Sequence, residues 1–169
     1  MARIYVSDER LKKLRQNLED AHADLSALRK EKNLAYTASG DTWHDNPYFN
    51  KLTQDEEALA RKIAEIQQTI SEAEVYSPSP RNVEQVRLGS IVRFARCYKK
   101  SGEETTETWE IVGFGETDVS RNHVAYNAPL GAALIGMKPG DIKQATTPKG
   151  AVEYEIIDLF PDWDTAPKG

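Results

Sequence analysis

Cysteine is almost absent from this sequence, because Cys97 is the only one in 169 residues. A single cysteine excludes an intrachain disulfide and a CxxC metal knuckle, which agrees with a reducing compartment. Long apolar runs are missing too, and no stretch approaches the ~18 residues that a membrane-spanning helix needs. The amino terminus, MARIYV, lacks the charged-then-apolar pattern of a secretory signal. We therefore expect a cytoplasmic protein with no membrane partner.

An excess of positive charge is also absent, because 27 aspartates and glutamates outnumber 22 lysines and arginines and give a net charge of −5. This balance argues against a protein that coats nucleic acid through a general basic surface, so any such contact must be local or made through a partner. The second half of the sequence lacks a nucleophile elbow, a phosphate-binding glycine loop and a dinucleotide fingerprint. We therefore interpret this half as a docking module.

The first half of the chain contains two stripes of residues spaced alternately by three and four. This spacing places each stripe on one side of a helix and is typical of a coiled coil. The first stripe is Leu11, Leu14, Leu18, Ala21, Leu25, Leu28, Lys32 and Ala35. The second is Leu52, Glu56, Leu59, Ile63, Ile66, Ile70 and Ala73. Ser7 or Asp8 can cap the first helix and Gly40 can end it, so residues 1–76 are predicted to form an antiparallel helical hairpin.

The turn between the stripes, near residues 40–49, reads GDTWHDNPYF and carries the most information. Asn46 followed by Pro47 is a good cap and first residue for the second helix. Asp41 and Asp45 stand on either side of the tip. Trp43 lies between them, although a tip far from any core has little structural need for a tryptophan.

Simpler explanations exist for the same tip residues. Asp45 can help to cap the second helix, and Asp41 can close an Asx turn after Gly40. His44 beside the two aspartates suggests a zinc ligand, but an exposed turn with three mixed ligands is a poor zinc site. The aromatic residues can simply fold over the end of the rod: Trp43, Tyr48 and Phe49.

The second half reads as a small β-rich domain. Pro78 and Pro80 end the helical pattern, so residues 77–84 are predicted to be a linker. Residues 85–160 are expected to form the domain, and residues 161–169 a tail. The predicted strands cover 90–96, 106–112, 123–126, 142–146 and 152–159. A short helix over 128–136, closed by Gly136, and a tight turn over 138–141 separate the last three strands.

Three features of the chain resemble the bacterial Gre transcript-cleavage factors, the GreA/GreB-like transcription elongation factors. They are the heptad hairpin with an acidic tip opened by Gly40 and Asp41, the proline-containing linker, and the carboxy-terminal segment. That segment, NAPLGAALIGMKPGD from Asn127 to Asp141, is similar to the family pattern N-S/A-P-L-G-x-A-L-x-G-x-x-x-G-D. The final strand AVEYEIIDL follows it.

The resemblance implies an α+β fold, with an FKBP-like second domain that docks on bacterial RNA polymerase. The hairpin would enter the secondary channel, meet the 3′ end of the nascent RNA and stimulate the polymerase's own cleavage of backtracked transcripts. Asp41 and Asp45 would act as the catalytic, metal-positioning acids, sharing Mg²⁺ with the polymerase active centre; no tightly bound cofactor is expected. Asn127, Pro129 and Leu130 are candidate partner-binding residues.

The tip departs from the usual family pattern GDLKENAEY, because the second acid is Asp45, four residues after the first instead of three. Gly40, Asp41 and Tyr48 match by position and Asn46 matches with a shift of one residue, whereas Trp43 and His44 do not match. A second hypothesis is therefore a regulator that binds the same channel without stimulating cleavage. A third is a prolyl isomerase or chaperone, whose pocket would be lined by aromatic residues: Trp109, Phe114, Tyr126, Tyr154 and Phe160.

Overall fold

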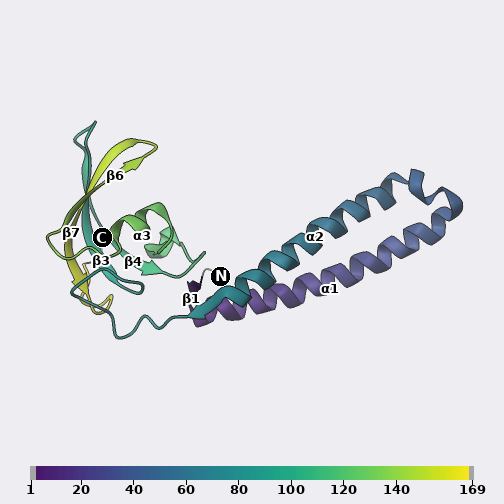
Figure 1. Ribbon diagram of the computed structural model, residues 1–169, viewed down its shortest axis with the longest axis horizontal. Coiled ribbons are helices and arrows are strands. Elements are labelled where there is room, and N and C mark those ends of the chain that lie inside the picture. The colour runs from purple at the N-terminus through teal and green to yellow at the C-terminus, as the bar shows by residue number, and fades with distance from the viewer. Residues whose placement is uncertain (1–2, 168–169) are drawn as a thin grey trace. The chain divides into compact units, whose positions relative to one another are not determined.

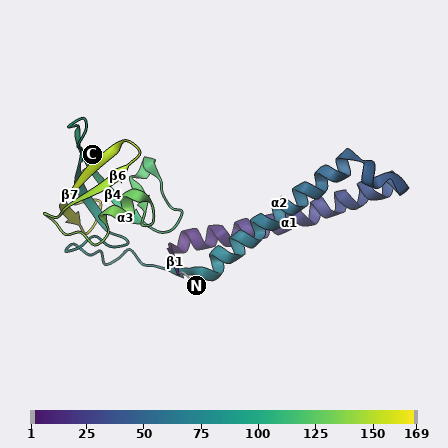
Figure 2. The same cartoon turned by 45° about the horizontal axis from the view of Figure 1, so that its top comes forward.

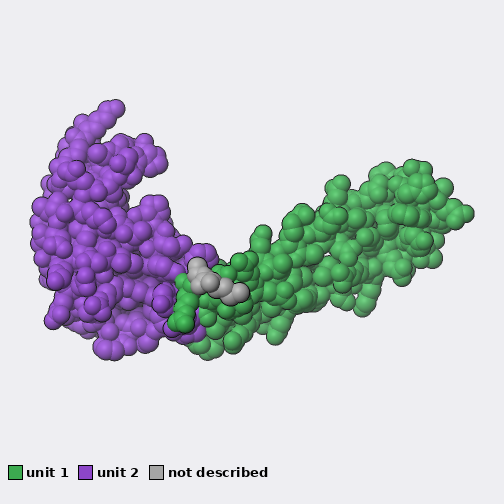
Figure 3. Space-filling view, in the orientation of Figure 1, with its two compact units in different colours: residues 1–3, 8–73 green, residues 4–7, 74–169 purple. Residues whose placement is uncertain are grey.

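The computed structural model describes residues 3–167, which divide into two compact units (Figures 1 and 3). Within that range, unit 1 holds Arg3 and Asp8–Ala73, and unit 2 holds Ile4–Ser7 and 74–167. The α+β class expected from the sequence is confirmed. Among the described residues, no helix combines the length and apolar character that crossing a bilayer requires.

Unit 1 is a pair of antiparallel helices, α1 (Asp8–Ser39) and α2 (Pro47–Glu72), joined by the 3₁₀ helix η1 (Gly40–Asp45). Figures 1 and 2 show α1 and α2 side by side over most of their length. All residues of both predicted stripes are buried or half-buried, so the predicted pairing of the helices is confirmed. Ala21, Leu25 and Ile63 form the buried centre of the contact. With 32 residues, α1 is about 48 Å long at ~1.5 Å per residue.

The α2 helix is shorter than the sequence suggested. It ends at Glu72, and Ala73–Val75 form β2, which pairs with β1 (Ile4–Val6) in a two-stranded sheet. Ala73 has an extended backbone, with φ −73° and ψ 129°. The expectation that residues 1–76 all belong to the hairpin is therefore wrong at both ends. Such short strands leave almost no periodic signal, and their pairing depends on contacts distant in sequence.

Unit 2 also contains a five-stranded sheet. In chain order, the strands are β3 (Ile91–Tyr98), β4 (Glu104–Val112), β5 (His123–Ala125), β6 (Ile142–Thr147) and β7 (Gly150–Phe160). Their order across the sheet is β5-β4-β3-β7-β6, antiparallel except for the parallel pair β4–β5. A short 3₁₀ helix, η2 (Val119–Arg121), precedes β5. All five predicted strands are present, with ends shifted by one or two residues.

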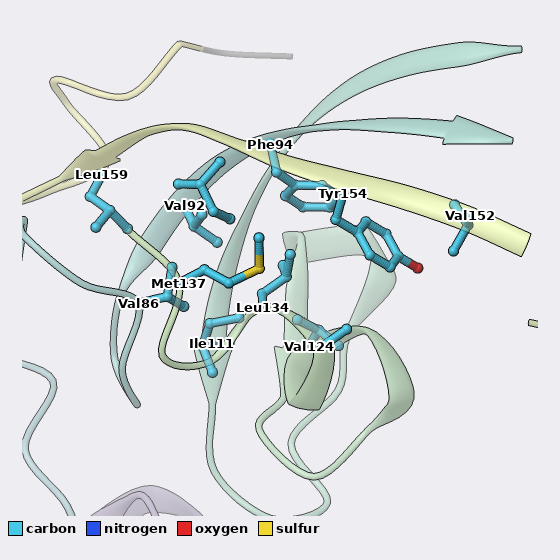
Figure 4. Close-up of a cluster of buried hydrophobic side chains, with 12 residues drawn as sticks. Val86, Val92, Phe94, Ile111, Val124, Leu134, Met137, Val152, Tyr154 and Leu159 are labelled. Carbon is cyan, nitrogen blue, oxygen red and sulfur yellow. The ribbon is translucent and has the colours of Figure 1, made fainter. Parts of the chain in front are cut away.

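One face of this sheet packs against α3 (Pro129–Leu134). Side chains from β3, β4 and β7 meet Leu134 and Met137 in a continuous buried cluster (Figure 4). Alternate residues of β7 are buried, as the sequence pattern predicted. The helix lies very close to β5, because a Cβ at Gly131 would stand 2.2 Å from the Ala125 carbonyl oxygen. The predicted turn is confirmed, since Asp141 N–H donates to the Lys138 carbonyl at 2.9 Å.

Candidate functional site at the hairpin tip

The backbone of the tip is fixed by residues that end one helix and begin the next. Gly40 has φ +53°, the left-handed conformation that stops a helix, so the predicted stop is confirmed. Asn46 caps α2, because its Oδ1 accepts a hydrogen bond from Tyr48 N–H at 2.9 Å. Its Nδ2 donates to Ser39 Oγ at 2.6 Å, and Ser39 in turn donates to the Ala35 carbonyl at 2.8 Å. Asn46 therefore links the two helices across the turn.

Both acidic residues of the tip are exposed to solvent. The Asp45 side chain is 81% exposed, and its Oδ2 lies 3.5 Å from His44 Nε2. The Asp41 carboxylate has no hydrogen bond or ion pair with any described residue. Asn46, and not Asp45, supplies the side-chain cap of α2. Both carboxylates of the tip are therefore exposed to solvent, and neither is needed to cap α2.

The tip tryptophan has a structural role, contrary to the expectation that it has little need to be there. The Trp43 ring centroid lies 5.5 Å from that of Tyr36 and 5.1 Å from that of Phe49. These three residues, hereafter the tip aromatic cluster, come from α1, η1 and α2. Offset and edge-to-face arrangements at such distances are favourable. Tyr48 lies outside the cluster, and its hydroxyl donates to the Glu31 carboxylate.

An interhelical ion-pair cluster lies next to the tip aromatic cluster. Glu56 Oε1 is 2.7 Å from Arg29 Nε, and Glu56 Oε2 is 2.8 Å from Lys32 Nζ. The hydrogen bonds from Lys32 and then Arg29 lower the pKa of Glu56 below its usual 4.5. Lys32 Nζ also lies 5.3 Å from the Phe49 ring centroid, within the range of a cation–π contact. The sequence held a signal for this pair, because Lys32 and Glu56 interrupt the two apolar stripes with opposite charges.

The tip offers few ligands for a metal ion. Across residues 3–167, no group of three or more histidine, cysteine or acidic side chains is arranged to hold one. Asp41 and Asp45 are hard oxygen donors, which suits Mg²⁺, and protein magnesium sites often supply only one or two carboxylates. Their chemistry therefore fits a magnesium ion whose remaining ligands come from elsewhere.

The candidate partner-binding residues lie in unit 2, where β5 leads into α3. Asn127 and Pro129 are exposed, and Pro129 is the first residue of the helix. Leu130 is half-buried and packs against the core of the unit. The aromatic residues considered for a pocket mainly serve the core: Tyr154 is buried in it, and Trp109 and Tyr126 pack against it.

Together, the units define a class of α+β protein, in which a helical hairpin with an exposed acidic turn precedes a five-stranded β domain in the sequence. The family model described as "Transcription elongation factor, GreA/GreB, C-term" matches residues 81–160. The transcription elongation factor GreA of Acidiphilium cryptum is 31% identical over 148 residues, covering 84% of this chain and 90% of the relative. That of Thermoanaerobacter pseudethanolicus is 28% identical over 156 residues, covering 92% and 96%. The chain belongs to the GreA/GreB family of transcription elongation factors.

Two solved structures are also similar to this chain. The GreA factor homolog 1 (Gfh1) of Thermus thermophilus is 22% identical and covers 94% of this chain and 99% of its own, with a TM-score of 0.42. The elongation factor GreA/GreB of Nitrosomonas europaea is 21% identical and covers 94% and 98%, with a TM-score of 0.36.

Proposed function

We propose that this elongation factor binds RNA polymerase, inserts its hairpin into the secondary channel and stimulates cleavage of the 3′ end of backtracked RNA. The observation that carries the proposal is the exposure of the Asp41 and Asp45 carboxylates on a turn joined to both helices by hydrogen bonds and aromatic contacts. The factor is accessory, because two carboxylates do not complete a metal site. In this proposal, the polymerase supplies the remaining ligands of the magnesium ion and holds the RNA.

Each part of the tip has a separate task in this proposal. Asp41 and Asp45 would hold one side of a magnesium ion shared with the polymerase. When bound, that ion would supply charge stabilisation and an activated water for attack on the RNA phosphodiester. Asn46 and the tip aromatic cluster keep the acids in position, and a misplacement near 1 Å costs about a hundredfold in such reactions.

In the same proposal, unit 2 docks on the polymerase surface through Asn127, Pro129 and Leu130. Asn127 and Pro129 are exposed and available for contact, while Leu130 anchors the segment by packing inward. The close approach of Gly131 to Ala125 fixes α3 against β5 and so holds this segment in one conformation.

A second candidate function has one observation in its favour. The His44 imidazole lies 3.5 Å from the Asp45 carboxylate, so it competes with a metal ion for the second acid. A factor restrained in this way would occupy the channel and alter initiation or pausing without shortening the transcript. Replacing His44 with alanine separates the two functions, because it would release cleavage activity only if the imidazole is what restrains Asp45.

The deciding experiment uses stalled, backtracked polymerase complexes with magnesium and the full chain. The unaltered protein should shorten the transcripts, and Asp41→Asn or Asp45→Asn should slow this at least about a hundredfold without loss of polymerase binding. Asp24→Asn is the matched control, since it makes the same change at an exposed site on α1. Unshortened transcripts with bound, unaltered protein would overturn the cleavage proposal and leave the regulator.

A further inference from the structure

Unit 2 contains a hollow that the proposed transcription function does not use. It has a volume of about 520 Å³ and lies where the β3–β4 and β6–β7 connections meet at one end of the sheet. Ligand pockets typically measure about 300–1,000 Å³. We call this hollow the basin, and its lining residues are Arg96, Tyr98, Lys100, Ser101, Glu103, Thr105, Glu107 and Lys149.

The inner part of the basin contains a loosely bound arginine, Arg96, which lies next to two aromatic rings of the core. The Arg96 guanidinium lies 5.8 Å from the ring centroids of both Phe94 and Tyr154, which Figure 4 shows next to each other in the core. Arg96 Nη1 lies 3.4 Å from Glu107 Oε1, and Arg96 Nη2 lies 3.5 Å from Glu107 Oε2. Both distances are longer than the ~2.7–2.9 Å of a strong charge-assisted hydrogen bond. Arg96 Nε is buried with no hydrogen-bond partner. The protein itself therefore leaves much of the hydrogen-bonding capacity of this guanidinium unused.

Glu107 does not need Arg96 to satisfy its oxygens. Its Oε2 accepts a hydrogen bond from Trp109 Nε1 at 2.8 Å, and its Oε1 accepts one from Thr105 Oγ1 at 3.1 Å. These donors hold the carboxylate in place from β4. Arg96 can therefore turn toward a second anion without leaving the half-buried Glu107 carboxylate unsatisfied, which would be costly for a polar group.

Two further cations lie at the rim on separate turns. Lys100 follows β3, and Lys149 lies between β6 and β7; both are exposed. Neither ammonium group forms an ion pair with another residue of the described chain. Three cations and two carboxylates line the basin, giving it a net charge of +1 in a chain of net charge −5. Charge of this sign in a hollow attracts anions.

We propose that the basin binds a small phosphorylated ligand with a planar ring, of the size of a mononucleotide. Lys100 and Lys149 contact the phosphate from opposite turns, and Arg96 supplies further donors from the inner part. The Tyr98 ring, which also lines the basin, provides a face for stacking. The Ser101 hydroxyl, which accepts from Glu103 N–H, can still donate to a sugar, and Thr105 Oγ1, which donates to Glu107, can still accept from one.

The test is titration of the full chain with adenosine monophosphate, followed by calorimetry and by amide NMR shifts. Saturable binding should perturb amides of residues 96–107 and 147–151. The double variant Lys100→Ala/Lys149→Ala should weaken binding by about tenfold or more, equivalent to ~1.4 kcal/mol. Lys138→Ala is the control, because it removes an exposed lysine of the same unit outside the basin and should leave affinity unchanged.

Two further ligands test separately whether the phosphate and the planar ring contribute to binding. Adenosine, which lacks the phosphate, and inorganic phosphate, which lacks the ring, should each bind at least about tenfold more weakly than the nucleotide. Absence of saturable nucleotide binding, or equal weakening by Lys138→Ala, would overturn the proposal. So would inorganic phosphate binding as tightly as the nucleotide. Circular dichroism of each variant verifies that unit 2 is folded. As an independent test, Arg96→Gln should also weaken the binding of adenosine monophosphate.

Discussion

Asn46 Nδ2 and Ser39 Oγ lie 2.6 Å apart, and this hydrogen bond joins the last residue of α1 to the cap of α2. The side-chain oxygen of the same asparagine, Oδ1, accepts a hydrogen bond from Tyr48 N–H. One side chain thus satisfies a free backbone donor at a helix start and closes the turn that carries the two acids.

Replacing Asn46 tests this double role. Asn46→Ala should destabilise the hairpin by about 1–2 kcal/mol, because it removes both the cap and the link to Ser39. Asn46→Asp should lose less, since it keeps the oxygen that accepts from Tyr48 N–H. Hydrogen exchange at the first turn of α2 measures the effect directly. Equal protection in all three proteins would contradict the assigned role.

Trp43 should be needed for the order of the tip rather than for its chemistry. Trp43→Ala removes the centre of the tip aromatic cluster and should cost about 1–3 kcal/mol of local stability. Trp43→Phe should retain most of that packing. We expect transcript cleavage to fall with the alanine variant and to recover largely with phenylalanine. Loss of cleavage to the same extent in both would instead indicate a direct role for the indole.

The Glu56 ion pairs should make hairpin stability depend on pH. The folded-state pKa of Glu56 lies below its usual 4.5, so its stabilising effect is present above that pH. The effect is lost as the pH falls through the lower folded-state pKa. At neutral pH, Glu56→Gln should cost about 1 kcal/mol or less, because the pairs are partly exposed.

Urea unfolding of both proteins at several pH values between 7 and 3 gives the comparison for Glu56. The difference between them should shrink toward the acidic end and also in high salt. A difference that stays constant over this pH range would show that the carboxylate charge contributes nothing.

A buried pair in unit 2 should be much more sensitive to substitution. Arg81 Nη2 lies 2.9 Å from Glu110 Oε1, and Trp163 Nε1 donates to Glu110 Oε2 at 2.7 Å. Arg81→Met leaves a buried carboxylate without its cation and should destabilise unit 2 by about 3–5 kcal/mol. The double variant Arg81→Met/Glu110→Gln should recover part of that loss. Thermal unfolding followed by tryptophan fluorescence measures both, and equal stability of all three proteins would refute the prediction.

Regular spacing made the hairpin predictable from sequence. Leu14, Leu25 and Ile63 lie where the two stripes placed them, Gly40 ends α1, and Asn46 caps α2. Each of these depends on residues within a few turns of one another. The larger strands of unit 2 were visible for a similar reason, because alternation over five or more residues leaves a local pattern.

Contacts between distant segments were not predictable in this way. The β1–β2 pairing joins residues almost seventy positions apart in strands of three residues each. Tyr36 was overlooked because it lies outside the first stripe, and its packing on Trp43 depends on the path of η1. The basin depends on two strands and two turns, so no single segment carried its pattern.

The tip aromatic cluster has a practical consequence for comparing members of the family. Its rings come from α1, η1 and α2, so the six residues of η1 are not an independent cassette. A chimera that received only residues 40–45 would contain Trp43 without its partner rings, Tyr36 and Phe49. Exchanges intended to transfer the character of this tip should therefore carry the whole span from Tyr36 to Phe49.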